Sequence, residues 1–124
     1  MYSPDDETTI AALIDSAKHW DENARAVMMS NVRVGSSSCA LCHLFLHLGG
    51  GCGGCPVREH TGSPYCIGTP WQQAQIEHYE SRDERCSREF TVAAKKEADF
   101  LWSLVPEDKQ HLRVEVSDDN QSAG

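Results

Sequence analysis

Apolar residues recur at steps of three and four along the first part of the chain. They are Ile10, Leu13, Ile14, Ala17, Trp20, Ala24, Val27 and Met28. A stripe with this period lies on one face of an α-helix. Ser3 can cap the first turn, and Pro4 suits its first position. The pattern therefore predicts a helix over residues 4–28, with Trp20 in the core.

A second helical pattern covers residues 70–104. Thr69 and Gln72 have the spacing of a capping box, and Pro70 stands at the first helical position. The stripe that follows is Trp71, Gln75, Tyr79, Arg82, Cys86, Phe90, Ala93, Glu97, Leu101 and Leu104. Polar residues interrupt it, so we expect either one long helix or two helices that meet near Ser81-Arg82-Asp83.

Two short segments alternate between apolar and polar residues, as half-buried strands do. They are residues 31–34 and 112–116. A lone strand has no partner for its backbone groups, so we expect the two segments to pair in a minor two-stranded sheet. The fold predicted for residues 1–116 is a single, mainly α domain. It has an N-terminal helix and a long C-terminal helix or helical pair. The polar tail 117–124 is expected to be disordered.

Five of the six cysteines gather between the two helical patterns. They are Cys39, Cys42, Cys52, Cys55 and Cys66, and the first four form two C-x2-C pairs separated by nine residues. Two such pairs can supply the four sulfurs of tetrahedral zinc. The segment has few apolar residues, so metal binding would supply the missing folding free energy. We therefore expect residues 39–69 to be a loop region held by structural Zn²⁺. Four of the five cysteines would bind it, with Cys66 as a substitute for one member of the pairs.

Other cysteine motifs match part of the spacing of these residues. Cys52, Cys55, His60 and Cys66 come within one residue of a zinc knuckle, although that set leaves the first pair without a role. A Cys-Pro ending also occurs in some iron–sulfur motifs. A redox couple would need a helix N-terminus and usually a thioredoxin-like sheet, and the sequence indicates neither. Cys86 lies on the helical stripe and is expected to be a buried thiol.

Charge narrows the range of partners. The formal net charge is −8, and the acidic excess lies at both ends of the chain. An acidic surface repels phosphate, so direct nucleic-acid binding is disfavoured and a basic partner is favoured. The N-terminus lacks the apolar run of a secretory signal, and no run approaches the ~20 residues that cross a membrane. We therefore expect a cytoplasmic protein, where cysteines favour metal over disulfides.

The combined motifs resemble a family of small uncharacterised proteins that are encoded mainly by bacteriophages and by prophage-bearing bacteria. The matching residues are Cys39-Ala-Leu-Cys42, Cys52-Gly-Gly-Cys55-Pro56-Val57, Thr61-Gly62, Cys66-Ile-Gly-Thr-Pro70-Trp71 and Phe100-Leu101-Trp-Ser-Leu104-Val-Pro106-Glu107. The resemblance implies that the five cysteines form one cluster without Cys86 and His60. It also implies a bacterial host cell as the place of action. It implies no activity.

Three classes of function remain after these observations. The first is an interaction module that binds and modulates or inhibits a host protein, for example a defence protein or one that binds nucleic acid. The second is a zinc-dependent nucleic-acid-binding protein that uses Arg58, His60, Tyr65 and Trp71 as a basic and aromatic patch. A nucleotide-signal-binding oligomer, with an exposed aromatic residue in an interface pocket, is the third. No catalytic constellation stands out, so we do not expect an enzyme.

Overall fold

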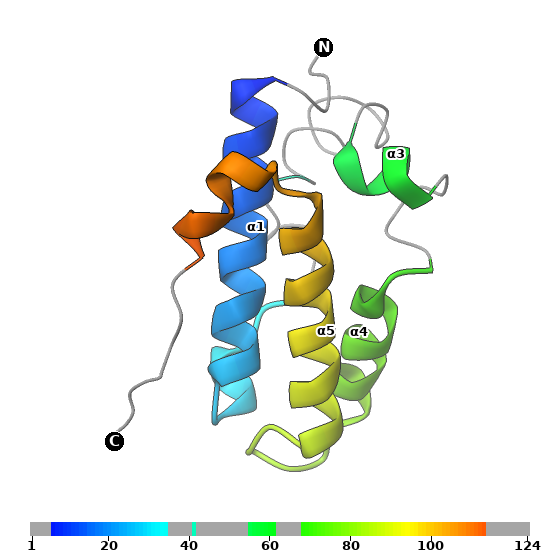
Figure 1. Ribbon diagram of the computed structural model, residues 1–124. Coiled ribbons are helices and arrows are strands. Elements are labelled where there is room, and N and C mark those ends of the chain that lie inside the picture. The colour runs from blue at the N-terminus through cyan, green and yellow to red at the C-terminus, as the bar shows by residue number, and fades with distance from the viewer. Residues whose placement is uncertain (1–5, 35–40, 42–54, 62–67, 114–124) are drawn as a thin grey trace.

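Helices are the regular elements of the computed structural model, which describes residues 6–34, 41, 55–61 and 68–113. The elements are α1 (Glu7–Arg25), η1 (Met29–Asn31), α3 (Pro56–Thr61), α4 (Pro70–Glu80), α5 (Arg88–Leu104) and η4 (Glu107–Leu112). Figure 1 shows α1 and α5 side by side, α4 on the other side of α5, and α3 near the end of α5. The prediction of a mainly α fold is confirmed. None of the described helices is both long and apolar enough to span a membrane.

The N-terminal helix is shorter than the predicted 4–28. It spans Glu7–Arg25, and Ser3 and Pro4 lie outside the described residues. Its apolar stripe is confirmed, because the buried apolar residues of α1 are Ala12, Leu13, Ile14, Ala17 and Trp20. Trp20 is only 3% exposed and belongs to the core, as predicted.

The end of α1 holds a distant segment of the chain. Backbone geometry becomes extended at Ala26 (φ −64°, ψ 138°), and Val27, predicted in the last helical turn, is exposed. The N–H of Cys86 donates to the carbonyl oxygen of Val27, and the N–H of Met29 donates to that of Glu84, each at 2.8 Å. These bonds use backbone groups that another helical turn would need, so the helix ends early and the α4–α5 connector docks on its end.

The region 70–104 forms two helices, the second of the two predicted alternatives. Helix α4 ends at Glu80 and α5 begins at Arg88, so the break includes the predicted Ser81-Arg82-Asp83. The second helix has its own start signal, because the hydroxyl of Ser87 accepts the N–H of Phe90 at 3.0 Å. On α5 the predicted stripe is confirmed, with Phe90, Ala93, Glu97 and Leu101 buried.

Helix α4 starts as predicted, with a variant of the capping box. The Oγ1 of Thr69 accepts the N–H of Trp71 at 3.3 Å, and Pro70 occupies the first turn. Gln72 reaches back one residue further than a capping box requires, because its Oε1 accepts the N–H of Gly68 at 2.6 Å. Gly68 has a φ of 84°, which favours glycine.

The alternation at residues 31–34 is real, but the segment is not a strand. Val32 and Val34 are buried while Asn31 and Arg33 are exposed, as the pattern predicts. Asn31 ends the short helix η1, and the backbone then becomes extended at Val32 (φ −94°, ψ 140°). No strand forms in the part of the chain that the structure describes, so the predicted pairing with 112–116 is absent there.

Side chains take the place of a second strand beside this segment. Asn23 is 2% exposed; its Nδ2 donates to the carbonyl oxygen of Arg33 at 2.9 Å, and its Oδ1 accepts the N–H of Arg33 at 3.3 Å. The Nε2 of His19 lies 2.7 Å from the same carbonyl oxygen. Trp71 donates from Nε1 to the carbonyl oxygen of Val34 at 2.8 Å. The segment is thereby fixed to α1 and α4 without a sheet.

The second predicted strand is also corrected where the structure describes it. Leu112 ends the 3-10 helix η4 (Glu107–Leu112), so a strand does not begin there. Residues 114–116 and the tail 117–124, predicted to be disordered, lie outside the described residues.

Arg113 fastens the end of η4 to both long helices. Its Nη2 lies 2.9 Å from Oδ1 of Asp21 on α1 and 2.8 Å from Oδ1 of Asp99 on α5. The other oxygen of Asp21 accepts the indole N–H of Trp102 at 2.8 Å. The guanidinium carbon of Arg113 is 5.8 Å from the centre of the Trp102 ring. These contacts join three elements in one polar network.

This network makes stability depend on pH. Burial by itself would raise the pKa of Asp99, but hydrogen bonds from Arg113 and Lys95 and their positive charges outweigh it and lower the pKa. Asp99 therefore stabilises the fold above its ordinary pKa of about 4, and this contribution is lost as the pH falls through the lower, folded-state pKa. We expect Arg113→Ala to reduce the loss of stability between about pH 6 and about pH 3. Urea midpoints at both pH values test this. An unchanged pH dependence would contradict it, and the exposed Arg88→Ala serves as control.

Candidate metal centre

One of the five candidate zinc ligands lies among the described residues. Cys55 immediately precedes α3 and is 6% exposed. The four others, Cys39, Cys42, Cys52 and Cys66, lie outside the described residues. Residues 6–34, 41, 55–61 and 68–113 contain no group of three or more His, Cys, Asp or Glu that could hold a metal ion. The zinc site therefore stays a prediction from the cysteine spacing.

Helix α3 (Pro56–Thr61) was not expected within the predicted loop region. Its signal in the sequence is the proline after Cys55, because proline suits the first position of a helix. The second C-x2-C pair thus ends at a helix start, which removes one of the two objections to a redox couple. The other objection remains in force for the described residues, which form no thioredoxin-like sheet.

Described residues from both cysteine pairs pack on the same core. Leu41, between Cys39 and Cys42 in the sequence, is 2% exposed, and its N–H donates to the hydroxyl of Ser16 on α1 at 3.3 Å. Cys55 and Val57 belong to the same buried cluster as Leu41. Ligands of one zinc ion must lie within about 4 Å of each other. Leu41 and Cys55 thus both belong to the core, and the common centre stays a prediction.

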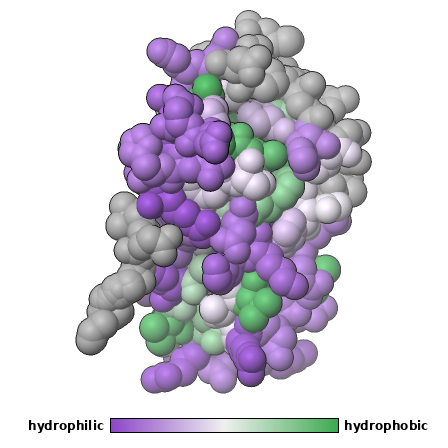
Figure 2. Space-filling model, viewed as in Figure 1, coloured by the Kyte–Doolittle hydropathy of each residue, from purple (hydrophilic) through white to green (hydrophobic). Residues whose placement is uncertain are grey.

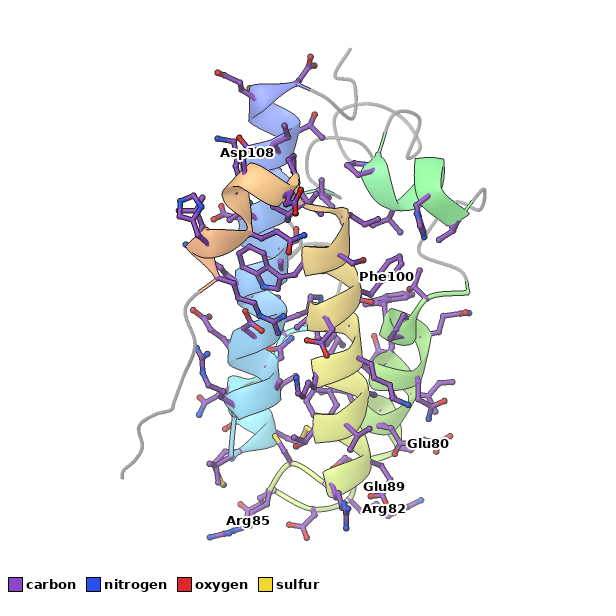
Figure 3. All side chains as sticks on the ribbon, in the orientation of Figure 1. Glu80, Arg82, Arg85, Glu89, Phe100 and Asp108 are labelled. Atoms are coloured by element: carbon purple, nitrogen blue, oxygen red, sulfur yellow. The ribbon has the colours of Figure 1, made fainter. Side chains whose placement is uncertain are left out.

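His60, which the resemblance excludes from the cysteine cluster, packs on α5. It is exposed, and its ring centre is 5.7 Å from that of Phe100 in an edge-to-face contact. Phe100 lies toward the α3 end of α5 in Figure 3. Trp71, another member of the expected nucleic-acid-binding patch, is half-buried and uses its indole N–H in the bond to Val34. His60 is thus exposed beside Phe100, and Trp71 is fixed to Val34.

Cys86 differs from its prediction. It lies in the connector between α4 and α5 and not on a helix, and it is half-buried where full burial was expected. Its position follows from the backbone bond to Val27, which fixes the connector to the end of α1. Burial raises the pKa of its thiol, so the protonated form is favoured.

The candidates for the exposed aromatic residue of a nucleotide pocket are Trp71, Tyr79 and Trp102, and their exposure differs. Trp102 is 3% exposed, Trp71 is half-buried, and Tyr79 is 69% exposed. An open pocket of about 590 Å³ lies at the C-terminal end of α4, and Tyr79, Glu80, Ser81 and Arg82 line it. Figure 3 shows Glu80 and Arg82 at this end of the molecule. Only Tyr79 thus has the exposure that such a site requires.

Comparison of the chain with models of protein families, with curated proteins and with solved structures finds no match.

Proposed function

We propose that this chain is a small acidic interaction module that binds a host protein and modulates or inhibits it, with its cysteine-rich segment held by structural zinc. One surface carries the proposal, and we term it the outer face of α4. Its residues are Gln72, Gln73, Ile76, Tyr79 and Glu80, all of them exposed.

The contacts of α4 show which side it turns away from the bundle. Ala74 is fully buried, and the ring of His78 lies 6.3 Å from that of Phe90 on α5. Ile76 is two positions from both Ala74 and His78, and each step turns the helix by about 100°, so it points away from α5. Its side chain is 46% exposed. A helix that served only to pack on α5 would carry polar residues at such positions.

Ile76 and Tyr79 form a continuous apolar surface. They stand three residues apart on one helix, so their side chains are neighbours. Among the described residues, the other exposed large apolar side chains lie apart in the chain: Val27 between α1 and η1, Val92 on α5 and Leu112 on η4. On the face drawn in Figure 2, hydrophobic residues form separate spots within a hydrophilic surface. Tyrosine is enriched among the residues that dominate binding energy at protein interfaces.

The charge of α4 favours a basic partner. Its charged residues are Glu77 and Glu80, and it contains no lysine or arginine. The net charge of the whole chain has the same sign. Acidic groups around an apolar anchor raise the rate of encounter with a basic surface and disfavour acidic competitors.

The test is affinity purification from a bacterial host lysate with three forms of the zinc-loaded protein. We expect one host protein to be enriched by the wild type and by Val92→Ser. We expect about 10-fold or greater loss with the double variant Ile76→Ser/Tyr79→Ser. Val92 is a matched control because it is 44% exposed, close to the 46% of Ile76. Equal recovery with all three forms, at equal helicity by circular dichroism, would refute the proposal.

A second candidate is the binding of a nucleotide signal in an oligomer. It is favoured by Tyr79 and Arg82, which line the pocket of about 590 Å³ and could stack on a base and pair with a phosphate. Glu80 lines the same pocket and would repel the phosphate. The interaction module is therefore the better-supported function. Direct binding of nucleic acid is disfavoured for the same reason, because acidic side chains repel its phosphates.

A further inference from the structure

We propose that the outer face of α4 docks a basic amphipathic helix of the partner protein. The apolar stripe of that helix would rest on Ile76 and Tyr79, and its lysine or arginine residues would pair with Glu77 and Glu80. This inference rests on the proposed function and specifies the chemistry of the partner.

The shape of the surface favours a helix as the occupant. Helix α4 has 11 residues, so its outer face is about 16 Å long. That length matches roughly three turns of a second helix. Ile76 and Tyr79, one turn apart, form a ridge that the side chains of a facing helix can straddle. The surface lies on one convex helix, and the open pocket at its C-terminal end is lined by Tyr79, Glu80, Ser81 and Arg82, so it does not run along the helix to enclose an extended peptide.

The acidic groups lie together on one side of this ridge. Glu80 is exposed and lies next to Tyr79 in the sequence, on the side of α4 opposite His78. At about 100° per residue, Glu77 lies on the same side, further around the helix, and the Nε2 of Gln73 donates to its Oε2 at 2.7 Å. Lysine or arginine residues along one flank of the partner helix can therefore reach both carboxylates. Beside Glu80, a guanidinium can also rest on the exposed ring of Tyr79.

Two positive side chains near this surface fix where the partner's charges can lie. Arg82 lines the pocket beyond Glu80, and Arg85 follows in the connector. Both would repel a basic helix that extended past the C-terminal end of α4. The favourable position for the partner is therefore along α4 itself, with its charges between Gln73 and Glu80.

A second copy of this chain is a poorer occupant. In a two-fold symmetric contact the same patch meets itself. Glu77 and Glu80 would then face their own counterparts without a lysine or arginine on α4 to compensate. An anionic membrane surface is disfavoured for the same reason.

The probe is a fluorescent peptide of about 18 residues, long enough to form a helix, with leucine at i, i+3, i+4 and i+7 and with lysine and arginine elsewhere. Matched peptides carry glutamate in place of the basic residues, or the same composition in scrambled order. Fluorescence anisotropy measures binding to the zinc-loaded protein at about 50 mM and about 300 mM salt. We expect the basic amphipathic peptide to bind about 10-fold more tightly than either matched peptide.

Variants of the protein assign the binding to α4. Ile76→Ser/Tyr79→Ser is expected to weaken it about 10-fold, and Glu77→Gln/Glu80→Gln to weaken it and reduce its salt dependence. Val92→Ser is expected to leave it unchanged. Equal binding of the scrambled or acidic peptide, or equal binding by Ile76→Ser/Tyr79→Ser, would overturn the inference. The inference would also be overturned if the wild-type protein were a dimer and Tyr79→Glu dissociated it. The outer face of α4 would then be occupied by a second copy of the chain.

The outcomes separate this inference from the proposed function. If Ile76→Ser/Tyr79→Ser no longer enriched the host protein and the wild type did not bind the basic peptide, the inference of a basic helix would be refuted. The proposal of an interaction module would still stand. Binding of the peptide on α4 with equal recovery of host protein by all forms would refute the proposed function and support the surface chemistry.

Discussion

The purified protein is expected to contain one zinc ion per chain, and four of the five single Cys→Ser substitutions are expected to abolish metal binding. Our predicted ligands are Cys39, Cys42, Cys52 and Cys55, so Cys66→Ser is the variant expected to retain zinc. Loss of the ion should remove folding free energy on the order of 10 kcal/mol from the segment that it holds. Elemental analysis and native mass spectrometry measure the metal content directly.

The control for this series is Cys86→Ser. Cys86 lies in the α4–α5 connector, and its substitution should leave the zinc content unchanged. Retention of zinc by Cys55→Ser, with loss in Cys66→Ser, would show that Cys66 replaces Cys55 as a ligand. Iron in the protein, or no metal together with oxidised cysteines, would refute the zinc site.

Phe90→Ala is expected to have the second largest effect. The Phe90 side chain is fully buried on α5, and its ring lies 6.3 Å from that of His78 on α4. Removing it leaves a cavity that helices α4 and α5 cannot close, at a cost of about 3–5 kcal/mol. A small domain has only about 5–15 kcal/mol of stability, so this change removes a large part of it.

Urea unfolding followed by circular dichroism measures this loss. Val92→Ala is the matched control, because Val92 is two residues away on the same helix and 44% exposed. Its effect should lie within about 0.5 kcal/mol of zero. Equal midpoints for the two variants would contradict the position of Phe90 in the core.

The helices could be predicted from the sequence because each repeats a local pattern. On α1 and α5 the apolar period alone identified the buried face, including Trp20 and Phe90. On α4 the predicted stripe was right at Trp71, which packs against the core, and wrong at Tyr79. Tyr79 was assigned to the inner stripe and is 69% exposed, while Ala74 is fully buried. An apolar residue that faces a partner has the same hydropathy as one that faces the core, so the sequence does not separate them.

Contacts between distant segments account for the other differences. The alternation of Val32 and Val34 predicted their burial correctly, but the backbone partners of the segment are Asn23, His19 and Trp71. The local sequence does not distinguish a segment whose backbone groups are hydrogen-bonded by side chains from one whose backbone groups are bonded by a second strand. The early end of α1 has the same origin, because residues 84–86 bind there. For the candidate metal centre, the spacing identifies the five cysteines, and only Cys55 lies in the described part of the chain.

The bonds of Asn23 to Arg33 give a criterion for recognising distant relatives. Asn23 uses both halves of its amide at once, so aspartate lacks the donor and leucine lacks both groups, although each is close in size. Core positions such as Leu13 can exchange among several apolar residues at modest cost. Ser16 lies seven residues before Asn23 on the same side of the helix, and its hydroxyl accepts the N–H of Leu41, which stands within the first C-x2-C pair. We therefore expect serine and asparagine seven residues apart, followed by two C-x2-C pairs, to be retained in relatives of this fold whose overall sequence identity is low.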